Sequence, residues 1–318
     1  TGVHPHLAAL AGQGDRRDLA REGSYRREAA AAGRGCRAAS FRQQARAMCI
    51  MALALGVSQE FPFILIHNRD EEWSRPTGLP ATLPNGIYCC TDLVAGGTWM
   101  GMNVRTGAVA ALTNVRSKDR MPDARRSRGE IVKEALSQTD EGSGAYSAMR
   151  SSCYKYSILR SDSLFPKEGR VPRVWWEACV PSSKVPGEWD RAEREVERGG
   201  VYARSNERTT DLDEGSWSKC KWLRDKVAEE IEGTGPECVG REGARSLAMK
   251  LGRLLSTSVP FKKEDLGPLD FSPHDEATEL LFQRGPFVDA TSMETDPDGT
   301  RWQAVVISCA STGEVYYF

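Results

Sequence analysis

The sequence predicts an α+β fold in which mostly antiparallel β-sheets are covered by helices. Three observations lead to this expectation. Short apolar runs rich in β-forming residues begin at Met48, segments with helical spacing of apolar residues follow, and residues 302–318 read as a closing β-hairpin. A domain with strands at both ends and helices between them typically forms sheets covered by helices. We therefore expect a layered architecture.

The first third of the region from Met48 is predicted to be a β-meander, because its apolar runs have strand length and are bounded by turns. Asn85-Gly86 is the strongest hairpin signal in it. Pro84 would confine its strand to the edge of a sheet. The turn at 105–107 predicts a second hairpin. The predicted strands are 49–55, 61–67, 81–84, 87–91, 98–104 and 108–114.

Three later segments carry apolar stripes at helical spacing, at 129–137, 217–231 and 244–255. Ser216 is the expected N-cap of the second helix. Residues 182–200 contain the charge run Glu188–Arg198, which we interpret as a solvated loop or an exposed helix. The proline-rich and acidic stretch 262–299 is expected to be a long surface excursion.

The composition narrows the function classes. Of the 318 residues, 40% are hydrophobic and 27% are charged, which suits a packed core. A net charge of −1 gives no reason to expect nucleic acid as a partner. No apolar run approaches the roughly 20 residues of a membrane span, so no transmembrane segment is expected. The nine cysteines form no Cys-x-x-Cys motif and there are four histidines, which favours free thiols in a reducing, cytoplasmic compartment without a bound metal or cofactor.

Residues 1–47 differ in composition from the rest of the chain. They are crowded with alanine, arginine and glycine and lack the apolar content of a core, so disorder is expected. Three interpretations stay open. The segment is a mitochondrial transit peptide, although Asp15 and Glu22 oppose that reading. It is upstream message read through before a start at Met48, or it is a disordered N-terminal extension.

Several short motifs occur in a characteristic order after residue 47. They are Met48-Cys49-Ile50, Asn68-Arg69-Asp70-Glu71 with Trp73-Ser74-Arg75-Pro76, Gly96-Gly97-Thr98-Trp99-Met100-Gly101, Ala110–Arg116, Arg126-Ser127-Arg128-Gly129-Glu130, Ser205-Asn206 before Trp217, and Gly299-Thr300-Arg301. Their order and approximate spacing are similar to those of the NRDE family, the transport and Golgi organisation protein 2 homologues. Region 48–318 is identified as a member of that family, although 140–200 and 262–299 match poorly.

The NRDE family resembles the N-terminal-nucleophile hydrolases, in the branch of penicillin V acylase and the conjugated bile-acid hydrolases. The resemblance implies an αββα layered sandwich. It also implies a cysteine amidase or acyl hydrolase that acts on a non-peptide C–N bond. In such enzymes the nucleophile is the first residue of the mature chain and its own α-amino group is the base. Cys49 would qualify once Met48 is removed.

The resemblance also assigns roles to other residues. Arg69, at the end of the second strand, would favour the Cys49 thiolate. Asp70 would hold the α-amino group, although Glu71 is an alternative, because the acylases place this acid three residues after the arginine. The remaining expected site residues are Asn114 and Asn206 as oxyanion donors and Arg301 as a second cation.

A different class of function stays open beside the enzyme. A cysteine in an apolar strand is often only a small buried hydrophobe. The same pocket could then bind an amide, an acyl group or a haem-like molecule without turnover. The resemblance implies roles in Golgi organisation, protein secretion, or haem or lipid trafficking, with mitochondrial and Golgi-associated locations as alternatives to the cytoplasm. His67 is expected to be a strand-end residue rather than a metal or haem ligand.

Overall fold

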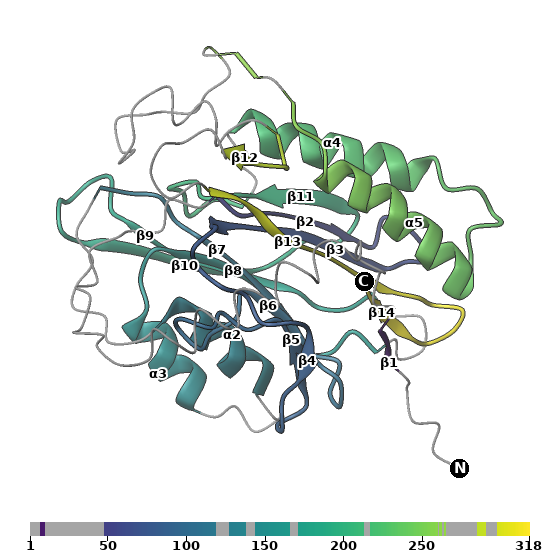
Figure 1. Ribbon diagram of the computed structural model, residues 1–318, viewed down its shortest axis with the longest axis horizontal. Helices are drawn as coiled ribbons and strands as arrows, with labels where there is room; N and C mark the ends of the chain where they lie inside the picture. Colours follow the sequence, from purple (N-terminus) through teal and green to yellow (C-terminus); the bar gives the residue numbers. More distant parts are fainter. Residues whose placement is uncertain are drawn as a thin grey trace.

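The computed structural model describes residues 7–9, 48–118, 127–137, 144–165, 171–212, 217–259, 261–262, 264, 285–290 and 298–318. Within these residues the chain forms two β-sheets and four helices. Figure 1 shows them stacked in layers, with helices above, the sheets in the middle and helices below. The prediction of an α+β sandwich with antiparallel sheets is confirmed.

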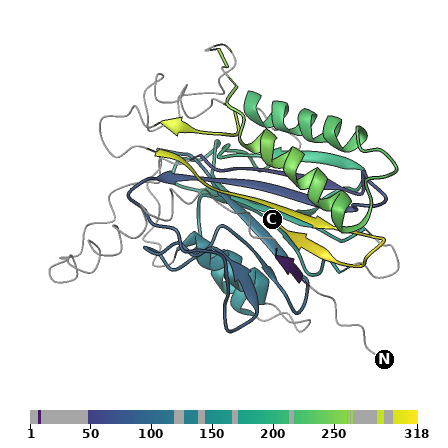
Figure 2. The same ribbon diagram turned by 45° about the vertical axis from the view of Figure 1, so that its right-hand side comes forward.

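The first sheet contains both ends of the described chain. Its strand order is β1-β14-β13-β3-β2-β11, and β12 pairs with β13. All of its pairs are antiparallel except that of β1 with β14, which Figure 2 shows side by side. The strands are β1 (Leu7–Ala9), β2 (Ile50–Leu55), β3 (Phe63–Glu72), β11 (Gly200–Arg204), β12 (Asp289–Ala290), β13 (Asp298–Ser308) and β14 (Val315–Tyr317).

The second sheet follows the chain without a crossover, in the order β10-β9-β8-β7-β6-β5-β4, and all of its pairs are antiparallel. Its strands are β4 (Ala81–Thr82), β5 (Ile87–Cys89), β6 (Met100–Asn103), β7 (Val109–Asn114), β8 (Tyr156–Ser161), β9 (Trp175–Pro181) and β10 (Trp189–Glu195).

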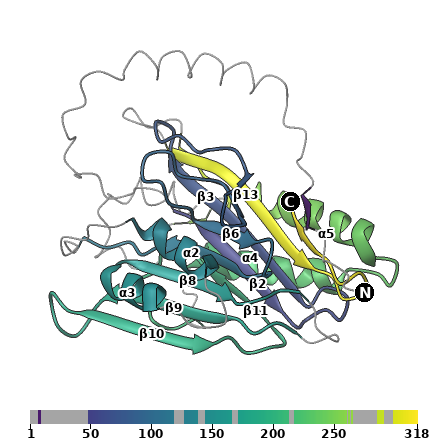
Figure 3. The ribbon, with the colours of Figure 1, turned by 90° about the horizontal axis from the view of Figure 1, so that it is seen from below.

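Three hydrophobic cores hold the four layers together. Helices α4 (Ser218–Glu232) and α5 (Gly240–Leu255) pack on the outer face of the first sheet. The facing sides of the two sheets form the central core. Helices α2 (Arg128–Ser137) and α3 (Gly144–Ser152) cover the outer face of the second sheet, as Figure 3 shows from below.

The predicted helices are confirmed. Helix α2 buries the four residues that share its apolar face, Ile131, Val132, Ala135 and Leu136. Helices α4 and α5 match the stripes at 217–231 and 244–255. Ser216, the expected N-cap, lies outside the described residues; Trp217 holds the N-cap position with an extended backbone. Within the described ranges, no helix combines the length and the apolar character needed to cross a bilayer.

The predicted β-meander is wrong in one respect. Strands β2 and β3 lie in the first sheet, whereas β4 to β7 lie in the second, so the chain crosses between the sheets after Glu72. Local turn signals fix hairpins but not the sheet to which each hairpin belongs. The hairpin at Asn85-Gly86 is confirmed, with Gly86 at φ +85° and β4 at the edge of its sheet.

The charge run Glu188–Arg198 is not a loop or a helix. It contains β10, the other edge strand of the second sheet, paired along its length with β9. Charged side chains are typical of edge strands, because they discourage pairing with another chain. The excursion predicted for 262–299 lies mostly outside the described residues, as do residues 10–47.

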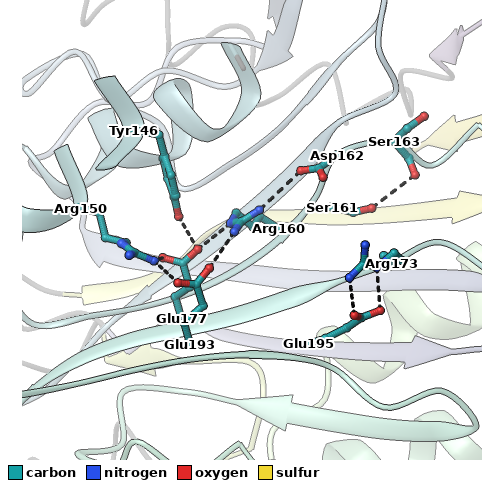
Figure 4. Close-up of polar contacts among 10 residues, drawn as sticks. All are labelled: Tyr146, Arg150, Arg160, Ser161, Asp162, Ser163, Arg173, Glu177, Glu193 and Glu195. Atoms are coloured by element: carbon teal, nitrogen blue, oxygen red, sulfur yellow. Dashed lines mark hydrogen bonds and ion pairs between the residues drawn. The ribbon is translucent and has the colours of Figure 1, made fainter. Parts of the chain in front are cut away.

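Charges on β10 take part in an ion-pair network with α3 and the neighbouring strands (Figure 4). Glu177 of β9 is its buried centre. It accepts hydrogen bonds from the Tyr146 hydroxyl at 2.9 Å and from Nε of Arg160 at 2.6 Å, and it pairs with Arg150 at 3.3 Å. Glu193 of β10 pairs with the same two arginines. The network fastens α3 to the second sheet.

Candidate active site

Cys49 lies immediately before β2, at the point where the first sheet meets a pocket. The register of β2 with β3, continued by one residue from the pair Ile50–Asn68, places Cys49 opposite Arg69. Cys49 is 5% exposed, and its thiol donates weakly to the main-chain oxygen of Asp70, 3.8 Å from Sγ.

The pocket has a volume of about 80 Å³ and lies between the two sheets and the start of α2. We call it the Cys49 pocket. Its lining residues are Cys49, Arg69, Glu71, Arg75, Asp92, Gly97, Thr98, Trp99, Leu112, Asn114, Ser127, Arg128 and Gly129. Four of the sequence motifs, which open at residues 48, 68, 96 and 126, therefore meet at one small cavity, and Asn114 adds a fifth.

Arg69 is fixed in the Cys49 pocket by contacts on several sides. Its guanidinium donates to the Thr77 hydroxyl at 2.8 Å and pairs with Glu71 at 3.3 Å and with Asp92 at 3.5 Å. It also lies over the ring of Trp99, 4.3 Å from the ring centroid. Arg69 is thus a rigid cation beside Cys49, but two carboxylates offset its charge.

Arg75 completes this charged wall. Its Nε and one terminal nitrogen both lie 2.8 Å from Oδ2 of Asp92. Asp92 also accepts the main-chain N–H groups of Val94 and Ala95, which closes a tight turn. Arg75 thus lines the Cys49 pocket, although the motif that contains it gave it no role there.

Asp70 and Glu71 occupy different environments, because successive side chains of a strand point to opposite faces. Glu71 lines the Cys49 pocket and pairs with Arg69. Asp70 accepts a hydrogen bond from the Thr300 hydroxyl through Oδ1 at 2.6 Å, whereas its buried Oδ2 has no hydrogen-bond partner among the described residues. Burial raises the pKa of Asp70 to about 7, although buried Lys219 opposes the shift.

The Cys49 thiol is not activated in the chain as it stands. Burial and, to a lesser extent, the Asp70 carboxylate raise the pKa of Cys49 to about 12. Arg69 acts in the opposite direction but does not outweigh them. The thiolate is the nucleophilic form, so a proton acceptor next to Sγ is needed before Cys49 can react.

The residue before Cys49 is enclosed. Met48 is fully buried; its sulfur accepts from Arg116 at 2.9 Å, and its carbonyl accepts from Nζ of Lys219 at 3.4 Å. Burial lowers the pKa of Lys219, while Asp70 opposes the change. Asp70, Lys219 and Met48 therefore share the side of the first sheet that faces α4.

Of the other expected site residues, Asn114 lines the Cys49 pocket, whereas Asn206 and Arg301 are not among its lining residues. Asn114 ends β7. Asn206 Oδ1 accepts from the Ser205 hydroxyl at 3.3 Å, and that hydroxyl also donates to the Cys49 carbonyl at 2.7 Å. Arg301 is the extra residue at a bulge in β13, and its guanidinium donates to the Trp73 carbonyl at 2.7 Å.

Glu207 changes the local charge beside Asn206, but its contacts are structural. Its carboxylate accepts the main-chain N–H groups of Ser205 at 3.0 Å and Trp217 at 3.3 Å. It also pairs with buried Arg204 at 3.6 Å. Glu207 therefore anchors the start of α4 to the end of β11.

His67 is not at a strand end, because β3 continues to Glu72. Its Nε2 donates to the Leu112 carbonyl of β7 at 3.1 Å, which joins the two sheets. Burial lowers the pKa of His67 to about 4, so the ring is neutral near pH 7. In the described residues, no group of three or more His, Cys, Asp and Glu side chains could hold a metal ion.

Sequence reasoning missed the lining residues Asp92, Ser127 and Arg128, and it also missed Thr77, which accepts a hydrogen bond from Arg69. Asp92 and Thr77 form an isolated β-bridge between loops, and no local pattern predicts such a contact. Ser127 and Arg128 lie in the family motif Arg126–Glu130, to which the sequence assigned no role in the site. Their position in that motif was the only feature of the sequence that could have indicated a role for Ser127 and Arg128 in the site.

The sequence profile of the Transport and Golgi organisation 2 family matches residues 48–318. The chain belongs to this family. The match begins at Met48, which lies next to the Cys49 pocket, and among the elements that the structure describes it covers all helices and all strands except β1. It confirms the family expected from the motifs. A comparison with curated proteins finds no matching sequence.

Proposed function

We propose that this member of the Transport and Golgi organisation 2 family is a cysteine amidase or related acyl hydrolase that acts on a non-peptide C–N bond. The observation that carries the proposal is that Cys49, Arg69 and Asn114 line one pocket, while the neighbouring Asp70 carboxylate acts on the pKa of the Cys49 thiol and has an Oδ2 without a hydrogen-bond partner among the described residues. The four-layer sandwich is consistent with an N-terminal-nucleophile hydrolase-like fold.

The proposed mechanism needs Cys49 to be the first residue of the mature chain. The peptide bond between Met48 and Cys49 would be cleaved, which gives Cys49 a free α-amino group. That group has an ordinary pKa of about 7.7–8.0 and lies close to the thiol of its own residue. Asp70 is better placed than Glu71 to hold it, because Oδ2 of Asp70 is buried and unpartnered whereas Glu71 pairs with Arg69 and Arg75.

In the first half of the proposed reaction, the α-amino group takes the thiol proton and Sγ attacks the carbonyl carbon of the amide. A C–S bond forms, the C–N bond breaks, and the ammonium group returns its proton to the leaving amine. In the second half, water hydrolyses the thioester with the same amine as base, releasing the acid and restoring the thiol. The side-chain amide of Asn114 would donate to the oxyanion, an interaction of roughly 2.7–4 kcal/mol in enzymes.

The test uses the full chain and two variants, Cys49→Ala and Cys49→Ser. A panel of non-peptide amides is hydrolysed by the processed wild-type protein, and mass spectrometry of the quenched reaction finds an acyl adduct on the peptide that contains Cys49. Both variants fold but lose turnover. Hydrolysis that persists in Cys49→Ala would show that a different group does the chemistry.

One observation favours a second candidate function, binding without turnover in Golgi organisation, protein secretion, or haem or lipid trafficking. While Met48 remains attached and buried, Cys49 has an amide in place of the amine and its thiol has a pKa of about 12. The Cys49→Ala variant separates the two functions in cells that lack the protein. Full rescue of the cellular defect by this variant supports binding, whereas loss of rescue with an intact fold supports chemistry.

A further inference from the structure

The Cys49 pocket is lined by one more cationic side chain than anionic side chains. Three arginines and two carboxylates line the pocket. Arg69 and Arg75 both pair with Glu71 and with Asp92, at N–O distances of 2.8–3.7 Å. The two carboxylates are thus shared by two arginines. The third arginine, Arg128, forms no ion pair in the part of the chain that the structure describes.

Arg128 is held at one point and otherwise faces the pocket. It is the first residue of α2, and one terminal nitrogen donates to the Lys155 carbonyl at 3.2 Å. Its other N–H groups make no hydrogen bond to any described residue. The side chain is half-buried, and burial lowers the pKa of Arg128, although Glu71 opposes this shift. A desolvated guanidinium without an anion is unfavourable, so an arriving anion would gain from meeting it.

The geometry of a guanidinium group selects among anions. Its planar fork matches the two oxygens of a carboxylate, and such bidentate pairs are stronger than neutral hydrogen bonds. The pocket holds about 80 Å³, which suits a small group rather than a whole substrate. A carboxylate at Arg128 would therefore lie within a few bonds of any carbonyl presented to Cys49.

We propose that Arg128 binds a carboxylate of the substrate, so that the preferred substrates are amides with an acidic group close to the scissile bond. N-acylated amino acids have this chemistry. That the bound carboxylate belongs to a substrate rests on the proposed function, whereas the binding of a carboxylate by Arg128 does not. Arg128 thus sets specificity, and Cys49 does the chemistry.

The binding test uses N-acetylglycine and its neutral counterpart, N-acetylglycinamide. Affinities are measured by titration into the full chain with Cys49→Ser, which prevents turnover. We expect N-acetylglycine to bind at least about tenfold more tightly than the amide, as is typical of one charge-assisted pair. Equal affinities, or no measurable binding of N-acetylglycine, would overturn the inference without any further variant.

Substitutions then assign the effect to one side chain. Arg128→Gln should abolish the preference for the carboxylate, and Arg128→Lys should keep part of it, because the charge remains but the fork is lost. Arg224→Gln, on the exposed face of α4, is the matched control and should keep the full preference. A preference that survives in Arg128→Gln would assign the anion to another group.

The two proposals fail in different ways. Carboxylate binding that depends on Arg128, in a protein without amidase activity, would reject the hydrolase and keep this inference. Amidase activity that does not distinguish acidic from neutral amides would reject this inference and keep the hydrolase.

Discussion

The main chain of Gly97 packs directly against the main chain of Gly129. A Cβ atom added to Gly97 would lie 2.7 Å from the Cα of Gly129, and one added to Gly129 would lie 2.7 Å from the nitrogen of Thr98. That nitrogen donates to the Gly129 carbonyl at 3.1 Å. Two motifs far apart in the sequence are therefore joined through glycine, and the contact forms one wall of the Cys49 pocket.

This contact predicts that Gly129→Ala destabilises the protein, because backbone cannot move aside as a flexible side chain can. We expect a loss of about 1–3 kcal/mol in the free energy of unfolding, measured by urea denaturation. The matched control is Gly252→Ala in α5, where a Cβ would meet nothing within 4 Å. That change should be neutral or stabilising by up to about 1 kcal/mol. Equal effects of the two substitutions would contradict the close contact.

The buried network around Glu177 gives a second prediction. Glu177→Gln removes the negative charge that Arg150 and Arg160 share (Figure 4) and should destabilise the protein by roughly 2 kcal/mol, as is typical of hydrogen bonds to charged groups. Glu195→Gln is the control on the same sheet, because Glu195 pairs with Arg173 in an exposed position. Surface pairs contribute little, so this control should leave the unfolding free energy nearly unchanged. If both variants unfold alike, the network does not fasten α3.

Much of the fold could be predicted from the sequence, because it depends on local patterns. The apolar stripe of Ile131, Val132, Ala135 and Leu136 identified the buried face of α2. Asn85-Gly86 identified a hairpin, since its second residue takes a positive φ. The division of the strands between two sheets is set by long-range pairing, such as that of β3 with β13, and no local pattern encodes it.

The candidate site was predictable in part, because short sequence motifs contain some of its residues. Family motifs indicated Cys49, Arg69 and Asn114, and these residues line one pocket. They could not show that Asp92 neutralises part of the charge of Arg69 from a separate loop. Nor could they show that Arg301 contacts Trp73, which follows from a bulge in β13. Contacts of this kind depend on three-dimensional packing rather than on sequence neighbours.

Asp70 predicts an unusual dependence of stability on pH. Its folded pKa of about 7 lies above the ordinary value of 3.8, so between these pH values the folded state holds a proton that the unfolded state has lost. The stability linked to this proton is complete below about pH 4 and is lost as the pH rises through 7. Asp70→Asn should remove this pH-dependent loss of stability, because asparagine does not ionise.

The measurement compares urea unfolding of wild type and Asp70→Asn at pH 5 and pH 8, with Met48 still attached. Wild type should lose at least about 1 kcal/mol more than the variant between the two pH values. The comparison cancels other titrating groups, such as His67, that both proteins contain. Parallel pH profiles would show that Asp70 is already ionised at pH 5 in the folded protein.

The most direct test of the central claim is the N-terminal residue of active protein isolated from cells, read by intact-mass and terminal-peptide mass spectrometry. The account predicts a chain that begins at Cys49, with amidase activity in that species and none in chains that keep Met48. Full activity in protein that retains Met48 would contradict it, because the α-amine base would not exist.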